Sequence, residues 1–286
     1  MVFAKKAQSK TNIDQMVGLF ITIVVNNIIN LTALLIRHFV WHPVPVNTAG
    51  IVLFFFGGSL NSFLGRGLLF TSVAMLGAAR AGLLKSFVPV FALFGGVVIL
   101  GERLGRMTWL GIGIVLFGLF LMSFDSVRRS GKSQDTAGDR LQTIKGLLVG
   151  LFAALFLGSG NVCRKAGITL IPDTVLANTY CSLFAIIVCA IVLLIRGKGR
   201  EMVAVVRHFD INYGIAGLFT TGALYSLFMS MRYIPISIAN SLSAIEPLFT
   251  ILFVWLFGLG KKEKVGIQIL FFGIIMVIGT IIIIIK

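Results

Sequence analysis

Two ionisable side chains, Lys85 and Glu246, stand inside strongly apolar stretches of the sequence, at residues 78–100 and 236–258. A charge at the centre of a membrane helix costs about 2.5–3.5 kcal/mol on insertion scales, and such side chains usually face a protein interior or a water-filled cavity. A cation and an anion across one cavity would suit a zwitterion such as an amino acid. Glu246 could also carry a coupling proton. A structural role stays open, in which the two residues form an ion pair that locks two parts of the protein, or Glu246 stays protonated.

Each of these residues lies within about one helical turn of a proline, Pro89 or Pro247. Proline lacks a backbone N–H and displaces the carbonyl four residues earlier, which here belongs to Lys85 or Ser243. Carbonyls freed in this way could bind a polar ligand beside a cavity or let the helix flex. We therefore expect a hinge or broken helix at both prolines, with an ordinary membrane kink as the alternative.

Other polar side chains share these apolar stretches. A rotation of about 100° per residue places Ala239, Ser243, Glu246 and Thr250 on one helix face, opposite bulky residues. The full set expected along a substrate or proton pathway is Lys85, Glu246, Ser243, Asn240, Asn61, Asn161 and Tyr225. The amides and the tyrosine could equally join helices by hydrogen bonds.

Four charged residues are expected in simpler roles. Arg164 and Lys165 are predicted to end a span and to extend toward the membrane interface. Glu102 and Arg103 are predicted to lie in a turn, where they cap a helix or form a local ion pair. We expect no metal site and no cofactor, because the three histidines are scattered and no nucleotide-binding loop is present.

The elements that must position these residues are membrane helices. Of the 286 residues, 57% are hydrophobic and 12% charged, and near-continuous apolar runs indicate helices instead of a barrel. Nine spans are predicted, at residues 14–36, 49–75, 78–100, 105–125, 144–163, 173–195, 212–233, 236–258 and 265–285. The fold class is therefore an all-α integral membrane protein, a multi-pass protein of the cell membrane.

The sequence also contains an internal repeat. Without a gap, residues 67–91 align with residues 225–249 at an offset of 158, and this alignment pairs Pro89 with Pro247. Four spans of the first half find partners in the second, and residues 144–163 find none. The plan is four plus five helices, and paired, broken helices in repeated bundles are typical of transporters with a substrate site between the halves.

Residues 77–122 (GAARAGLLKSFVPVFALFGGVVILGERLGRMTWLGIGIVLFGLFLM) and their weaker echo at 236–258 resemble the EamA-like branch of the drug/metabolite transporter superfamily. The resemblance implies a ten-helix permease built from two inverted halves, here without the first helix. It divides the chain into a polar N-terminus (1–13), a first repeat (14–125), a basic linker (126–143) and a second repeat (144–286). The second half departs from the pattern, because residues 258–263 (GLGKKE) replace the Gly-Glu-Arg turn at residues 101–103.

The net charge of +15 is attributed to basic loops beside the membrane, so nucleic acid is not an expected partner. The distribution of Lys and Arg favours a cytoplasmic N-terminus and an outside C-terminus, whereas the resemblance implies a cytoplasmic C-terminus. Both orientations stay open.

The predicted function is secondary transport, as a permease or exporter, of a small polar metabolite such as an amino acid, by alternating access and with proton coupling as an option. Its partners would be that small molecule and the lipid bilayer, with a homodimer as a further option. An enzyme is not expected. The alternatives are a nontransporting membrane subunit and, with less support, a membrane-embedded enzyme that modifies lipid.

Overall fold

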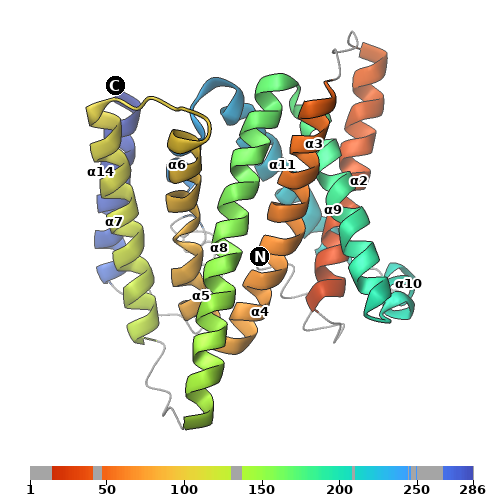
Figure 1. Cartoon of the computed structure of the whole chain (residues 1–286), viewed down its shortest axis with the longest axis horizontal. Coiled ribbons are helices and arrows are strands. Elements are labelled where there is room, and N and C mark those ends of the chain that lie inside the picture. Colours follow the sequence, from red (N-terminus) through yellow and green to blue (C-terminus); the bar gives the residue numbers. More distant parts are fainter. Residues whose placement is uncertain are drawn as a thin grey trace. The chain divides into compact units, whose positions relative to one another are not determined.

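The computed structural model describes residues 15–40, 47–129, 137–207, 210–243, 245, 249 and 267–285, and every regular element in this part of the chain is helical (Figure 1). In chain order the elements are α2 (Gln15–Val40), α3 (Thr48–Gly57), η1 (Gly58–Gly65), α4 (Arg66–Leu76), α5 (Ala78–Lys85), α6 (Val88–Val98), α7 (Arg106–Arg129), α8 (Ala137–Leu170), α9 (Thr174–Ile195), α10 (Gly199–Arg207), α11 (Ile211–Tyr233), α12 (Ile236–Ser243) and α14 (Ile267–Ile285).

Six helical stretches in the described residues are long and apolar enough to cross a membrane: Met16–Arg37, Thr48–Leu76, Arg80–Val98, Gln142–Leu170, Thr174–Ile195 and Ile211–Tyr233. Two predicted spans, 105–125 and 265–285, correspond to the shorter apolar stretches Arg106–Met122 and Phe271–Ile285. The span predicted at 236–258 is described mainly through α12, and most of its remainder lies outside the described residues. The all-α membrane fold is therefore supported, whereas the count of nine spans stays a prediction.

The chain divides into two compact units, and the division does not follow the two sequence halves. Unit 1 comprises Met1–Phe70 and Ser159–Tyr233, and unit 2 comprises Thr71–Gly158 and Ile234–Lys286. Each unit therefore combines helices from the first half of the sequence with helices from the second half.

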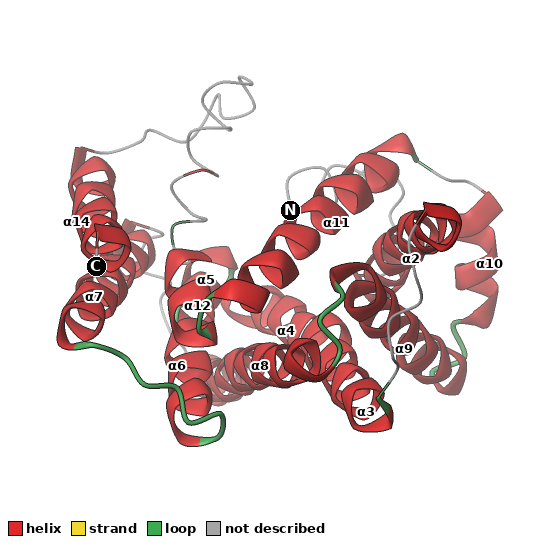
Figure 2. Ribbon diagram, turned by 90° about the horizontal axis from the view of Figure 1, so that it is seen from above, coloured by secondary structure: helices red, strands yellow, loops and turns green. Residues whose placement is uncertain are grey.

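In unit 1, α9 packs against α2, α3, η1 and α11 (Figure 2). Its main apolar cluster joins the start of α2, around Val17 and Ile21, to Ala185 and Cys189 of α9. Small residues allow this close packing: a Cβ built at Gly217 on α11 would lie 2.7 Å from the Cβ of Val25 on α2. The helices of unit 1 thus approach one another where glycine removes the side chain.

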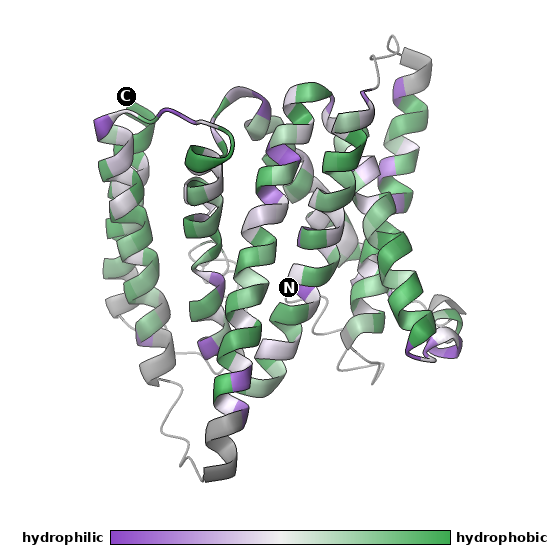
Figure 3. Ribbon diagram, in the orientation of Figure 1, coloured by the Kyte–Doolittle hydropathy of each residue, from purple (hydrophilic) through white to green (hydrophobic). Residues whose placement is uncertain are grey.

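In unit 2, α7 lies beside α14, and the hydrophobic colour runs along both helices in Figure 3. A Cβ at Gly111 would lie 2.9 Å from the carbonyl oxygen of Gly279, and a Cβ at Gly118 would lie 2.7 Å from Cγ of Met276. Glycines on facing helices therefore bring the two backbones into contact, and Ile112 and Val115 complete a buried apolar cluster.

Two of the predicted spans are interrupted. Within residues 49–75 the helix passes from α3 into η1, which is a π-helix, and then into α4, although this segment contains no proline. Within residues 78–100, α5 ends at Lys85 and α6 begins at Val88, with Pro89 in its first turn. The helix is therefore interrupted next to Pro89, where the expected hinge stays a prediction, whereas the π-helix was not predicted.

The break before α6 is closed by short-range backbone bonds. The amide of Ser86 donates to the carbonyls of Gly82 and Leu83, and the amide of Phe87 donates to the carbonyl of Leu84. Bonds between residues three apart tighten the last helical turn, as is common at a helix terminus. The chain thus keeps most of its hydrogen bonding across the break.

The offset of 158 that aligns the two sequence halves also relates α5 to α12. Adding 158 to the bounds of α5, Ala78 and Lys85, gives Ile236 and Ser243, the bounds of α12. The two short helices therefore start and end at equivalent positions of the repeat.

Candidate functional site

Unit 1 contains a fully buried arginine in the last two turns of a spanning helix. Arg164 lies on α8 and is 1% exposed, the largest of the fully buried side chains in the described residues. Its Nη1 donates to Oδ1 of Asn61 over 2.9 Å, and its Nη2 donates to the hydroxyl of Ser62 over 2.7 Å. Both acceptors belong to η1, so the π-helix and α8 meet at this guanidinium.

The amides around Arg164 form a chain of hydrogen bonds. Asn61 Nδ2 donates to Oδ1 of Asn161 over 2.9 Å, and Asn161 lies three residues before Arg164 on α8. Two of the predicted pathway residues, Asn61 and Asn161, are thus in direct contact. Because Asn61 accepts from the arginine and donates to Asn161, its amide orientation is fixed from both sides.

Glycines bring the surrounding helices close enough to enclose this cluster. A Cβ at Gly160 on α8 would lie 2.8 Å from the backbone nitrogen of Asn61, and a Cβ at Gly57 would lie 2.8 Å from Cγ of Arg164. A Cβ at Gly58 would collide with the carbonyl group of Cys181 on α9. The π-helix therefore sits directly against the backbones of α8 and α9.

An aromatic ring and a thiol are further neighbours of Arg164 among the described residues. The ring of Phe228 on α11 stacks over the guanidinium, with 5.5 Å from Cζ to the ring centroid. Phe54 on α3 meets Phe228 edge to face, at a centroid separation of 6.4 Å. Cys181 interacts electrostatically with Arg164. The cation is thus covered by an aromatic face on one side and by neutral polar groups along its edge.

The prediction that Arg164 and Lys165 end a span is wrong. Helix α8 continues to Leu170, about one and a half turns beyond them, because the first proline that can end the helix is Pro172. Lys165 is half-buried, and its Nζ donates to the carbonyl of Met231 in the last turn of α11. A lysine at that position stabilises the carboxyl end of α11, where backbone carbonyls carry partial negative charge.

A second polar group joins α2 to α9 within unit 1. Asn30 Nδ2 donates to Oδ1 of Asn26 over 2.6 Å and to the hydroxyl of Ser182 over 3.0 Å, and Asn178 Nδ2 donates to Oδ1 of Asn30 over 3.0 Å. These amides satisfy one another, as expected for polar side chains that hold membrane helices together.

An ion pair lies at one end of these two helices. Arg37 Nη2 is 2.6 Å from Oδ2 of Asp173, and both side chains are about a tenth exposed. Oδ1 of Asp173 also accepts from the amide of Leu176 and caps α9. Tyr225, another predicted pathway residue, lies within electrostatic range of Asp173 and Asn178, and its hydroxyl is buried.

The other predicted pathway residues belong to unit 2. Lys85 is half-buried at the last turn of α5. On α12, the amide of Asn240 donates to the carbonyl of Ile236 over 3.3 Å, and the hydroxyl of Ser243 donates to the carbonyl of Ala239 over 2.9 Å. Glu246 and Pro247 lie outside the described residues, so the expected facing of Lys85 and Glu246 stays a prediction.

Unit 2 also explains the role of Glu102. Its carboxylate accepts from the amides of Ile236 and Ser237 and from the hydroxyl of Ser237, at the start of α12. Glu102 is thus a helix cap, as predicted, but it caps a helix that lies 134 residues later in the chain instead of its own turn. Nothing in the sequence points to this partner, because the contact is made only in the folded chain.

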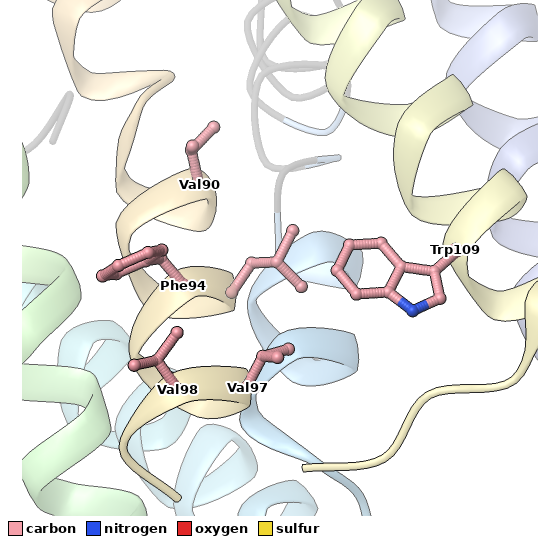
Figure 4. Close-up of a pocket in the computed structure, with 6 residues that line it drawn as sticks. Val90, Phe94, Val97, Val98 and Trp109 are labelled. Carbon is pink, nitrogen blue, oxygen red and sulfur yellow. The ribbon is translucent and has the colours of Figure 1, made fainter. Parts of the chain in front are cut away.

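An apolar recess between α6 and α7 is not a candidate for binding a polar molecule. It is lined by Val90, Leu93, Phe94, Val97, Val98 and Trp109, and in Figure 4 the indole of Trp109 reaches from α7 toward α6. These side chains offer almost no hydrogen-bonding groups, and Phe94 and Val98 are largely exposed. The described residues contain no cluster of His, Cys, Asp or Glu that could hold a metal ion.

The buried polar cluster around Arg164 was missed as a cluster by sequence reasoning, which named only Asn61 and Asn161. A signal was present: Arg164 follows apolar residues and is followed by Gly167 and Ile168, so its span could have been extended past it.

Comparison with known proteins gives the family. No curated protein matches the chain. A crystal structure superimposes with a TM-score of 0.70 over 99% of this chain and 93% of its own, at 15% sequence identity, and this likeness shows the fold alone. The model of the EamA-like transporter family matches residues 1–124 and again residues 144–285. EamA proteins are membrane transporters of the drug/metabolite type and generally not enzymes. Because the two matches cover nearly the whole sequence, the chain belongs to the EamA-like transporter family.

Proposed function

We propose that this protein is a secondary transporter of a small polar metabolite, such as an amino acid, that works by alternating access. The observation that carries the proposal is the buried cluster of Arg164, Asn61, Asn161 and Ser62 inside spanning helices of an EamA-family chain. Buried ionisable groups in membrane helices mark substrate and ion pathways.

The interrupted helices support the same proposal. A π-helical segment supplies Asn61 and Ser62, and π-helical turns occur frequently at functional sites. The break between α5 and α6 lies beside Lys85 and Pro89. Irregular backbone at membrane depth is tolerated where it is enclosed by protein or lines a cavity. Pro247, which lies at the equivalent position of the repeat, is proposed as a second hinge.

Counterflow in proteoliposomes tests the proposal. Liposomes that contain the purified full chain are loaded with a mixture of unlabelled amino acids, nucleosides or small organic acids, and uptake of each labelled member of the mixture is followed from outside. We expect at least one label to accumulate transiently above the level in protein-free liposomes. Clamping the pH on both sides then shows whether a proton moves with the substrate.

Alanine substitutions in the polar cluster of Arg164, Asn61, Asn161 and Ser62 should abolish this exchange. The matched control is Gly222→Ala, because a Cβ at Gly222 meets nothing within 4 Å and leaves the helices in place. If no labelled amino acid, nucleoside or small organic acid exchanges faster than in protein-free liposomes, the proposed function is wrong.

A further inference from the structure

We propose that Arg164 is the binding residue for a carboxylate group, and that the substrate of this protein therefore carries a single carboxylate. The term substrate rests on the proposed function, whereas the binding of a carboxylate by Arg164 does not. The argument uses the burial of Arg164, the charge of its neighbours, and the geometry of its five N–H donors.

The charge of Arg164 is not balanced by an acidic residue in the part of the chain that the structure describes. Its hydrogen-bond acceptors, Asn61 and Ser62, are neutral, and Asp173, in the same unit, is paired with Arg37. Isolated charges are costly to bury unless they are paired. A bound anion would supply the missing negative charge.

The geometry leaves one donor of the guanidinium without an acceptor. Nη1 donates to Asn61, Nη2 donates to Ser62, and the side chain of Cys181 also interacts with the group, whereas Nε is buried and has no hydrogen-bond acceptor. Phe228 covers one face of the group. A ligand must therefore approach in the plane of the guanidinium, along the edge formed by Nε and one Nη. Two parallel N–H donors on such an edge match the two oxygens of a carboxylate.

The charge of the site favours a monovalent anion. Lys165, the next residue, points its ammonium group at the carbonyl of Met231 at the end of α11. One guanidinium balances one carboxylate, whereas a doubly charged phosphate would leave a buried negative charge. Asn61 and Asn161 act as positioning residues, because their hydrogen bonds fix the orientation of the guanidinium.

Thermal stabilisation of the purified full chain in detergent tests the inference. A ligand that binds the folded state raises the melting temperature. The probes are L-amino acids and small monocarboxylates, each paired with its carboxamide, together with inorganic phosphate and sodium chloride at equal ionic strength. We expect at least one carboxylate to raise the melting temperature, and its carboxamide, phosphate and chloride to have little effect.

Three variants locate the binding. Arg164→Lys keeps the charge but loses the two-donor edge, so affinity should fall about tenfold or more. Asn61→Asp places a carboxylate where the amide oxygen lies 2.9 Å from Nη1, so it should raise the melting temperature without ligand and abolish the effect of the carboxylate probe. Arg232→Lys, at an exposed arginine on α11, is the matched control and should bind as the wild type does.

The inference is overturned if no carboxylate stabilises the wild type, if carboxamides or phosphate stabilise it as well, or if Asn61→Asp keeps wild-type affinity. Asn61→Asp decides the question even if Arg164→Lys fails to fold. Counterflow separates the two proposals. If the protein exchanges carboxamides as fast as the corresponding carboxylates, the inference about Arg164 is refuted and transport is not. If a carboxylate binds but no compound is exchanged, transport is refuted and the inference is not.

Discussion

Replacing Glu102 by glutamine should destabilise the protein far more than a typical change of a partly exposed side chain. The carboxylate of Glu102 receives three hydrogen bonds at the start of α12: from the amide of Ile236, from the amide of Ser237 over 3.1 Å, and from the hydroxyl of Ser237. Glutamine has nearly the same shape, so the change tests charge and hydrogen bonding instead of packing.

The expected decrease in the free energy of unfolding follows from these contacts. Glutamine keeps one acceptor oxygen and turns the other into an NH2 group that faces an N–H donor. It therefore loses at least one hydrogen bond to a charged acceptor, which contributes about 1.5–3 kcal/mol. It also loses the attraction between a negative charge and the helix amino end, about 0.3–1 kcal/mol. We expect the free energy of unfolding to fall by about 2–4 kcal/mol.

Thermal unfolding in detergent measures this effect, with Glu201→Gln as the matched control. Glu201 also lies in the first turn of a helix, α10, but its side chain is exposed. A double-mutant cycle with Ser237→Ala should give a coupling energy, because the two side chains share a hydrogen bond. If Glu102→Gln lowers stability no more than Glu201→Gln, the assignment of Glu102 as the cap of α12 is refuted.

Two further predictions concern unit 1. Asp173→Asn should keep the cap of α9 but lose the ion pair with Arg37, which should lower the free energy of unfolding by about 1–3 kcal/mol. Asp173→Ala should lose both the cap and the ion pair and lower it by about 1 kcal/mol more, as measured by chemical or thermal unfolding. Equal effects of the two variants would contradict the capping role. Gly58→Ala should prevent correct folding, because its Cβ would collide with the carbonyl group of Cys181, whereas Gly222→Ala has open space and should behave as wild type in size-exclusion chromatography.

The sequence predicted the class of the fold because the membrane imposes strong local rules. Apolar runs of sufficient length must form helices in lipid, so the spans could be located without knowledge of their partners. The effect expected of Pro89 is local as well, and α5 ends at Lys85 and α6 begins at Val88 next to this proline. The repeat was visible because equivalent positions kept the same residues, and the bounds of α5 and α12 carry the same offset.

The departure of the second half from the family pattern also has a structural counterpart. Glu102 caps α12, whereas α5 begins after Gly77 without a side-chain cap. At the offset of 158, the residue equivalent to Glu102 is Gly260, which has no side chain to serve as a cap. The difference between Glu102 in the first half and Gly260 in the second is therefore visible in the sequence. That Glu102 caps α12 is visible only in the structure.

The sequence by itself determined that this chain is a bundle of membrane helices with paired prolines, because helix formation in lipid and the effect of proline depend on neighbouring residues alone. The tertiary structure decided which polar residues meet. Arg164 joins Asn61 across 103 positions of the chain, and Glu102 reaches Ile236 across 134. Such contacts depend on which helix faces pack together, and glycines such as Gly57 and Gly160 set that packing by removing side chains where backbones touch. A buried charge is satisfied only by the groups that packing brings to it, so the surroundings of Arg164 became visible only in the folded chain.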